Sequence, residues 1–179
     1  TQQDMLVIKC ALAAANRAMR DAGKRLPIMV QASFDLNGGQ NMLTGCDPSA
    51  FVSTFLPFNE VDVLGLNCAF GPSELTETMR YIASNWPRLV SALPNAGLPI
   101  MVDGKSAFPM NPADFTKGVV RYVDEFGVNI VGGCCGTMPE HLKMLVEAVG
   151  VPNGHRSSEF GIRNSESSSR QSVIRNPQS

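Results

Sequence analysis

Two kinds of hydrophobic pattern alternate along the first 150 residues of the chain. In one, apolar residues recur every three or four positions, as in a helix with one buried face. In the other, apolar residues follow one another in short runs, as in a strand buried on both faces. The first pattern predicts helices over 5–22, 47–58, 73–85, 112–127 and 139–149. The second predicts strands over 27–34, 61–68 and 128–133, and another within 88–99 that runs into a Pro/Gly-rich loop.

Local signals mark the ends of several predicted helices. Gly23 follows the last residue of the first helical pattern and acts as a stop signal. Asp47 is a typical capping residue, and Pro48 occupies the first helical position. Thr137 and Glu140 have the spacing of a capping box and predict the start of the last helix. Several prolines lie between the last strands, and they predict a loop before the helix over 112–127.

The alternation of strands and helices predicts an α/β fold with parallel strands joined by helical crossovers. Four strands are expected within residues 1–150. Because a closed eight-stranded α/β barrel takes about 250 residues, the pattern favours half of a barrel or a small open sheet. Residues 151–179 contain eight serines and four arginines with few large apolar groups, and they predict a disordered tail or an interdomain linker.

Composition narrows the classes of function. With 44% hydrophobic and 17% charged residues, the chain has the composition of a globular protein with a real core. The net charge of −1 gives no basic surface for nucleic acid, and no apolar run is long enough for a membrane span. We therefore expect no nucleic-acid or membrane partner. The odd number of cysteines and a start without signal-peptide features indicate a reducing, cytoplasmic location.

Three cysteines stand at the ends of two predicted strands: Cys68, and the adjacent pair Cys134 and Cys135. The pair cannot easily form a disulfide, because neighbouring Cα atoms lie about 3.8 Å apart, below the usual disulfide range. The carboxyl ends of parallel strands meet at one edge of the sheet, where sites are built. Three thiolates there suit a tetrahedral Zn²⁺ whose fourth position is open for water or substrate.

A simpler interpretation is that the adjacent cysteines are small buried residues, since free cysteine is among the most buried residue types. The third thiol at an equivalent strand end and the glycines beside the pair favour the metal site. Cys10 falls within a predicted helix and Cys46 in a loop before a helix cap. We expect both to be ordinary thiols.

Three motifs resemble the homocysteine S-methyltransferase family, and within it the homocysteine-binding domain of cobalamin-dependent methionine synthases. They are "GLNCAFGP" at 65–72, "PNAGLP" at 94–99 and "VNIVGGCCGTMPEH" at 128–141. The resemblance implies that residues 1–150 form the C-terminal half of a (β/α)8 TIM barrel, about its last four strands with their helices. It also implies that Cys68, Cys134 and Cys135 hold a catalytic zinc that activates the homocysteine thiolate for methyl transfer, forming methionine.

Candidate residues for holding the amino-acid end of homocysteine lie beside the cysteines. Asn67 precedes a candidate ligand, and the "PNAGLP" loop offers Asn95, Ala96 and Gly97. Each has a structural alternative, because such residues are common in turns and at strand ends. Two further candidates follow the first strand: Ser33 and Asp35, whose carboxylate could pair with the ammonium group or begin a turn. Of the two histidines, His141 is expected to be a solvated helix residue, and His155 belongs to the predicted tail.

The resemblance further implies partners outside this chain. Cobalamin and 5-methyltetrahydrofolate would act through other modules, and the first half of the barrel, with an acidic residue that binds the substrate ammonium, would precede Thr1. We therefore expect the isolated chain to show little activity. Two alternatives stay open: the same reaction with S-methylmethionine or betaine as the methyl donor, and a non-catalytic zinc-binding fragment.

Overall fold

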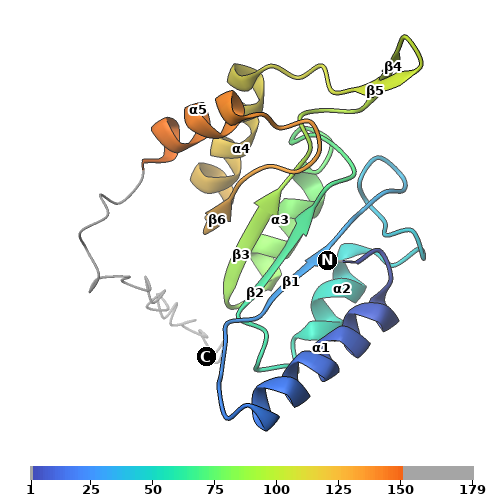
Figure 1. The fold of residues 1–179 in the computed structure, drawn as a ribbon, viewed down its shortest axis with the longest axis vertical. Helices are drawn as coiled ribbons and strands as arrows, with labels where there is room; N and C mark the ends of the chain where they lie inside the picture. Colours follow the sequence, from blue (N-terminus) through green and yellow to red (C-terminus); the bar gives the residue numbers. More distant parts are fainter. Residues whose placement is uncertain (1, 151–179) are drawn as a thin grey trace, which may run out of the picture.

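A parallel four-stranded sheet forms the centre of the computed structural model, which describes residues 2–150. The strands lie in the order β1-β2-β3-β6, and each neighbouring pair is parallel (Figure 1). The predicted α/β class and the four predicted strands are thereby confirmed, whereas the predicted tail over 151–179 lies outside the described residues. The strand bounds are β1 Met29–Ala32, β2 Val63–Asn67, β3 Leu89–Leu93 and β6 Ile130–Val131.

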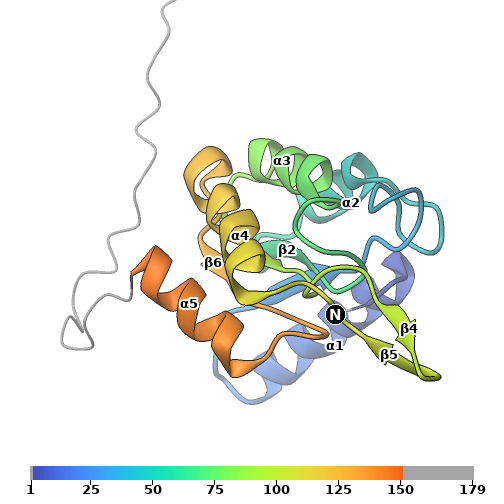
Figure 2. The same ribbon diagram turned by 90° about the horizontal axis from the view of Figure 1, so that it is seen from above.

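Each predicted helix is present, with ends that differ from the predicted ones by up to three residues. Seen from above in Figure 2, the helices follow an arc that starts with α1 and ends with α5. None of the helices within residues 2–150 is long and apolar enough to cross a membrane. The helix bounds are α1 Met5–Asp21, α2 Pro48–Phe55, α3 Thr76–Asn85, α4 Pro112–Phe126 and α5 Pro139–Val149.

The helix caps agree with the sequence at α2 and differ at α5. Asp47 caps α2 by accepting a hydrogen bond from the Ala50 N–H at 2.8 Å. The predicted capping box of Thr137 and Glu140 is wrong, because the residue that caps α5 is Met138. The hydroxyl of Thr137 instead donates to the Cys134 carbonyl at 2.7 Å. Thr137 therefore stabilises the loop before the helix and does not cap the helix itself.

The core lies between the sheet and the helices. Alternate strand residues, among them Leu64, Leu66 and Ala92, are fully buried there with the aromatic side chains of α2. Phe51 and Phe55 pack edge to face at 5.4 Å between ring centroids, a favourable aromatic geometry. Burial of this apolar surface is the main force that holds the helices against the strands.

A polar row crosses the other face of the sheet. Gln31, Gly65 and Ser91 occupy matching positions on β1, β2 and β3. The Gln31 amide donates to the Ser91 hydroxyl at 3.0 Å, across the central glycine. Gly65 makes this contact possible, since a Cβ at that position would overlap the carbonyl and hydroxyl oxygens of Ser91.

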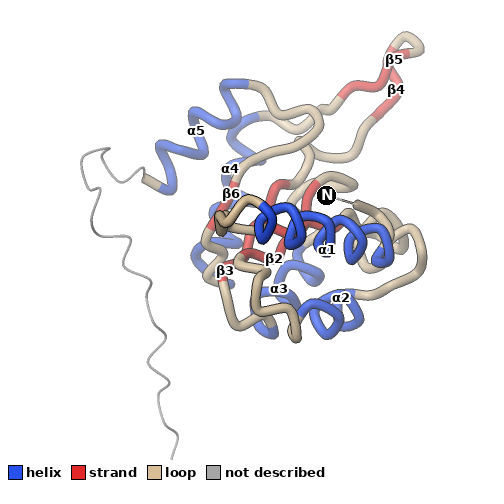
Figure 3. Tube along the Cα trace, turned by 60° about the horizontal axis from the view of Figure 1, so that its bottom comes forward, coloured by secondary structure: helices blue, strands red, loops and turns tan. Residues whose placement is uncertain are grey.

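An antiparallel hairpin replaces part of the loop predicted before α4. It consists of β4 (Ile100–Val102) and β5 (Lys105–Ala107) and projects away from the sheet and helices (Figures 1 and 3). Its turn is formed by Asp103 and Gly104, both with positive φ, which is the conformation that an Asp-Gly pair favours in a two-residue hairpin. The Asp-Gly dipeptide was the signal in the sequence for this hairpin. The prolines on either side of it also favour a loop, and they obscured that signal.

The close approach at Gly65 predicts a large loss of stability on substitution. Gly65→Ala should lower the free energy of unfolding by about 2–3 kcal/mol, because strand β3 must move to accept the methyl group. Urea denaturation followed by circular dichroism measures this. The matched control is Gly23→Ala: nothing lies near its Cβ, so only its positive φ costs stability, about 1 kcal/mol. Equal losses in the two variants would contradict the packing argument.

Candidate metal centre

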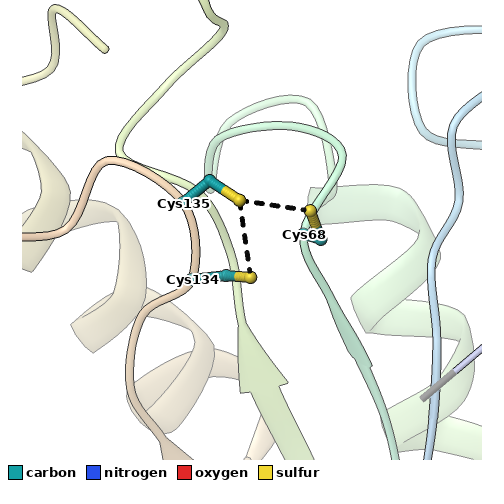
Figure 4. Close-up of side chains that lie close together, drawn as sticks. All are labelled: Cys68, Cys134 and Cys135. Carbon is teal, nitrogen blue, oxygen red and sulfur yellow. Dashed lines mark hydrogen bonds between the residues drawn. The ribbon is translucent and has the colours of Figure 1, made fainter. Parts of the chain in front are cut away.

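Three thiols from two separate loops converge at the carboxyl edge of the sheet. The Cys135 Sγ atom lies 3.7 Å from the Sγ of Cys68 and 3.9 Å from that of Cys134. All three sulfurs lie within 4.8 Å of one another, and Figure 4 shows their side chains pointing toward each other. The structure therefore brings together the three cysteines that the sequence singled out. Cys10 and Cys46 are not part of this cluster.

This convergence requires both loops to bend over the end of β3. Cys68 follows β2 and the cysteine pair follows β6, with β3 between these strands. Strands two places apart in a sheet are separated by about 9.6 Å, far more than the distances between the sulfurs. Cys68 and Ala69 accordingly adopt left-handed backbone conformations, with φ of 65° and 63°. Non-glycine residues rarely do so, and each costs roughly 1–2 kcal/mol.

We call residues 93–96, at the end of β3 and just after it, the bridging segment. On one side, this segment holds the Cys68 loop. The Cys68 N–H donates to the Leu93 carbonyl at 3.0 Å. The Asn95 N–H donates to the Phe70 carbonyl at 2.9 Å. These two bonds continue the pairing of β2 with β3 beyond the regular strands.

The same bridging segment holds the cysteine pair on its other side. The Cys134 N–H donates to the Pro94 carbonyl at 2.8 Å, and the Cys135 N–H donates to the Asn95 side-chain oxygen at 3.0 Å. The Ala96 N–H in turn donates to the Cys135 carbonyl at 2.9 Å. Both backbone groups of Cys135 are therefore fixed by one short piece of chain.

Two glycines give the cysteine loop its tight path. Gly136 has a φ of 77°, and a Cβ at this position would overlap the Phe108 side chain. A Cβ at Gly133 would overlap the Thr137 side chain. Residues with side chains would open the loop and separate the thiols.

His141 is not the solvated helix residue that the sequence predicted. Its side chain is buried, with a relative exposure of 6%. Its Nδ1 lies 3.1 Å from the Met138 nitrogen, and its Nε2 lies 2.9 Å from the Met110 carbonyl oxygen. Its position in the first turn of α5, where a side chain can accept from the capping residue's N–H, was the signal for this role.

The spacing of the sulfurs fits a tetrahedral thiophilic metal. A tetrahedral ion with metal–sulfur bonds of about 2.3 Å, the length typical of zinc, separates its sulfur ligands by about 3.8 Å. Two of the three separations, 3.7 and 3.9 Å, match that value. Three cysteine ligands leave a fourth position for another ligand, as in catalytic zinc sites. Cys68, Cys134 and Cys135 could therefore hold such an ion with little rearrangement.

Cys135 resists ionisation when no cation is near it. The hydrogen bond with Cys68, partial burial and the charges of the neighbouring thiols together raise the pKa of Cys135 from 9.0 to about 11. A thiol with this pKa is protonated at neutral pH, so a metal must displace its proton. Metal binding at this cluster is therefore coupled to proton release.

Asn67 is a substrate candidate whose side chain reaches one of the sulfurs. Its side-chain nitrogen lies 3.8 Å from the Cys134 Sγ and can donate a weak hydrogen bond to it. Its side-chain oxygen is buried and has no hydrogen-bond partner among the described residues. A buried acceptor without a partner is unfavourable, so this oxygen would gain a hydrogen bond if the atoms that cover it moved to admit a donor.

The candidates in the "PNAGLP" loop have structural contacts of their own. Asn95 and Ala96 belong to the bridging segment, and the Ala96 carbonyl also accepts from the Met110 N–H at 3.3 Å. Gly97 has a φ of 85°, and its Cα lies against the position that a Cβ on Gly71 would occupy. Substrate contact by these three residues stays a prediction, whereas their contribution to the shape of the loop is directly visible.

Ser33 and Asp35 lie just beyond β1, the strand next to β2. The Ser33 hydroxyl donates to one carboxylate oxygen of Asp35 at 3.0 Å. The Gln3 amide donates to the other oxygen at 3.0 Å. Asp35 is therefore held in place by two polar neighbours and is not one of the groups that cluster with the cysteines.

Comparison with known proteins identifies relatives over nearly the whole described chain. The family model for homocysteine S-methyltransferase matches residues 1–149. The methionine synthase of Mycobacterium leprae (strain TN) is 36% identical over 162 residues, covering 87% of this chain and 13% of that protein. The methionine synthase of Mycobacterium tuberculosis (strain ATCC 25618 / H37Rv) is 36% identical over 149 residues, covering 83% of this chain. The chain thus spans only 12–13% of the length of these relatives.

Solved structures agree on the fold. The homocysteine methyltransferase MmuM from Escherichia coli matches with a TM-score of 0.53 in both its oxidised and its metallated forms. The sequence identities are 18% and 17%, and the matches cover 76% and 75% of this chain but 40% of each of those chains. At such identities, the likeness shows a similar α/β fold built on a parallel sheet.

The raised pKa of Cys135 predicts the pH dependence of its reactivity in the metal-free chain. Because only the thiolate is alkylated, the reaction of Cys135 with iodoacetamide should accelerate until the pH reaches about 11. Cys68→Ala removes the largest cause of the shift and should move this profile to lower pH. Fragment-ion mass spectrometry distinguishes Cys135 from Cys134. An identical profile in Cys68→Ala, with Cys46→Ala as the unaffected control, would contradict the assigned cause.

Proposed function

We propose that this chain forms the zinc-binding part of a methionine synthase and activates homocysteine for methylation. The chain belongs to the homocysteine S-methyltransferase family, and the two relatives described above are methionine synthases. The observation that carries the proposal is the convergence of Cys68, Cys134 and Cys135, with two of their three sulfur separations at tetrahedral spacing. Within this proposal, the four parallel strands correspond to the last four strands of a (β/α)8 barrel. The arc of helices in Figure 2 supports that correspondence.

The three cysteines are well suited to the proposed chemistry. Zn²⁺ bound by them would supply the positive charge that keeps these sulfurs, and the homocysteine sulfur beside them, ionised at neutral pH. Three cysteinates carry three negative charges, so they offset the charge of a divalent ion and preserve the nucleophilicity of a further thiolate. The reaction joins a methyl group to the homocysteine sulfur, whose thiol proton is lost, and the donor keeps the electron pair of the broken bond.

Asn67 is the residue best placed to orient the amino-acid end of the substrate. Its unpartnered side-chain oxygen is an acceptor next to the sulfurs, and the homocysteine ammonium is a donor. Asp35 offers a carboxylate at the neighbouring strand end, held by Ser33. Asn95, Ala96 and Gly97 would contribute mainly through the shape of the loop that faces the substrate.

The methyl donor would reach this site from outside the described chain. The two methionine synthases are about eight times longer than their matched regions, which supports further modules that carry cobalamin and bind 5-methyltetrahydrofolate. S-methylmethionine or betaine as the donor, and a zinc-binding fragment without catalysis, are the competing hypotheses. Each gives a different result in the experiment below.

The function predicts methionine formation that depends on both the thiols and the remainder of the barrel. The 179-residue chain should bind about one zinc ion but form little methionine from homocysteine and methylcobalamin. Co-expression with the segment that precedes the matched region in the Mycobacterium tuberculosis relative should restore methionine formation. Zinc is measured by metal analysis and methionine by chromatography. Cys134→Ser combined with Cys135→Ser should abolish both signals, whereas Cys10→Ser should change neither.

The possible failures have different meanings. Unchanged zinc content in the double serine variant would contradict the metal assignment. A completed barrel that binds zinc but forms no methionine from methylcobalamin, S-methylmethionine or betaine would favour the non-catalytic fragment. If methionine formed only from S-methylmethionine or betaine, that compound would replace methylcobalamin as the assigned donor. Full turnover by the 179-residue chain would contradict the need for the other half of the barrel.

A further inference from the structure

We propose that His141 is a positioning residue for the cysteine loop, acting as a neutral imidazole that closes a ring of hydrogen bonds around Cys135. Its functional consequence rests on the proposed metal binding, whereas the ring itself is a property of the metal-free chain. His141 lies six positions after Cys135 in the sequence and in the first turn of α5. It does not belong to the thiol cluster.

The partners of the imidazole determine its protonation state. The Met138 backbone N–H can only donate, so Nδ1 of His141 must accept and carries no proton. The Met110 carbonyl oxygen can only accept, so Nε2 must donate and carries the proton. Both bonds form together only in the neutral imidazole with the proton on Nε2.

From Met110 the hydrogen bonds lead directly to the metal-binding loop. The Met110 N–H donates to the Ala96 carbonyl at 3.3 Å, and the Ala96 N–H donates to the Cys135 carbonyl at 2.9 Å. The chain from Cys135 to Met138 then returns to His141 and closes the ring. The ring therefore consists of separate hydrogen bonds that are joined through the backbone of Met110, of Ala96 and of residues 135–138.

Burial gives this ring its mechanical importance. His141 is 6% exposed and packs edge to face against Phe115, with 5.5 Å between ring centroids. Water therefore has little access to replace its bonds. The loop it restrains contains Gly133 and Gly136, which lose more conformational freedom on ordering than other residues. Such a loop needs an external restraint to keep its thiols in one arrangement.

The expected consequence is a change in metal affinity and not only in stability. Groups that hydrogen-bond near metal ligands fix the ligand orientation, and their removal typically lowers metal affinity about 10–100-fold. The ring fixes the Cys135 carbonyl through Ala96, while Asn95 fixes the Cys135 N–H. Without the His141 imidazole, no side chain joins the Met110 carbonyl to the Met138 N–H at the start of α5. We therefore expect Cys135 to sample orientations that do not bind metal.

Two substitutions separate the hydrogen bonds from the packing. His141→Phe keeps a ring against Phe115 but loses both hydrogen bonds. His141→Gln keeps both an acceptor and a donor, because the side-chain oxygen and nitrogen of glutamine are joined to one carbon. In the imidazole, Cε1 joins the acceptor Nδ1 to the donor Nε2 in the same way. Zinc affinity is measured in the full chain by competition with a chromophoric chelator. The Phe variant should bind about 10–100-fold more weakly, and the Gln variant should recover most of that loss.

Ile82→Ala is the matched control, because this fully buried residue of α3 belongs to the main core cluster, which contains no residue of the ring. It should lower the denaturation midpoint while leaving zinc affinity unchanged. Three results would each overturn the proposal. The first is wild-type zinc affinity in His141→Phe, the second is an equal loss of affinity in Ile82→Ala, and the third is no recovery of affinity in His141→Gln.

A second measurement tests the ring without zinc. Nitrogen NMR of the metal-free wild-type chain at neutral pH should show a neutral His141 imidazole protonated at Nε2. A proton on Nδ1, or a charged ring, would overturn the proposal directly. If the wild-type chain bound no zinc, the proposed function would fail, and this spectrum would still decide whether the ring exists.

Discussion

One short piece of backbone, the bridging segment at 93–96, makes the thiol cluster possible. It receives or donates hydrogen bonds on both sides, so that the loop with Cys68 and the loop with Cys134 and Cys135 are fixed to the same reference. Without such a segment, cysteines that follow strands two places apart would lie too far from each other to share an ion. The local geometry of the thiols thus depends on how the chain leaves β3.

The helical layer supports the strained part of this arrangement. Cys68 and Ala69 hold left-handed conformations, which persist only where the surrounding structure enforces them. A few residues later, the Pro72 carbonyl accepts from the buried Tyr122 hydroxyl of α4. Gly118, one turn earlier on α4, lets Pro72 pack directly on the helix, since a Cβ there would lie 2.6 Å from the proline ring. Packing against α4 therefore offsets the backbone strain beside the thiol cluster.

Sequence patterns predicted the strands, the helices and the three thiols because each depends on local periodicity or on position after a strand. They missed the hairpin over β4 and β5, whose Asp-Gly turn stands among prolines that also favour a loop. They also missed the burial of His141, because its bond to the Met110 carbonyl and its packing on Phe115 join segments that are distant in sequence. Contacts between distant segments, such as the bridging bonds of Asn95, leave no periodic trace in a single sequence.

In the proposed function, these loops create one tetrahedral, sulfur-rich metal site with a position left for the substrate. X-ray absorption at the zinc edge of the zinc-loaded chain tests it most directly, because this method counts the ligands and measures their distances. We expect three sulfur ligands at about 2.3 Å with one lighter atom, and a fourth sulfur when homocysteine is added in the completed barrel. A zinc ion surrounded mainly by nitrogen and oxygen, or by fewer than three sulfurs, would contradict it.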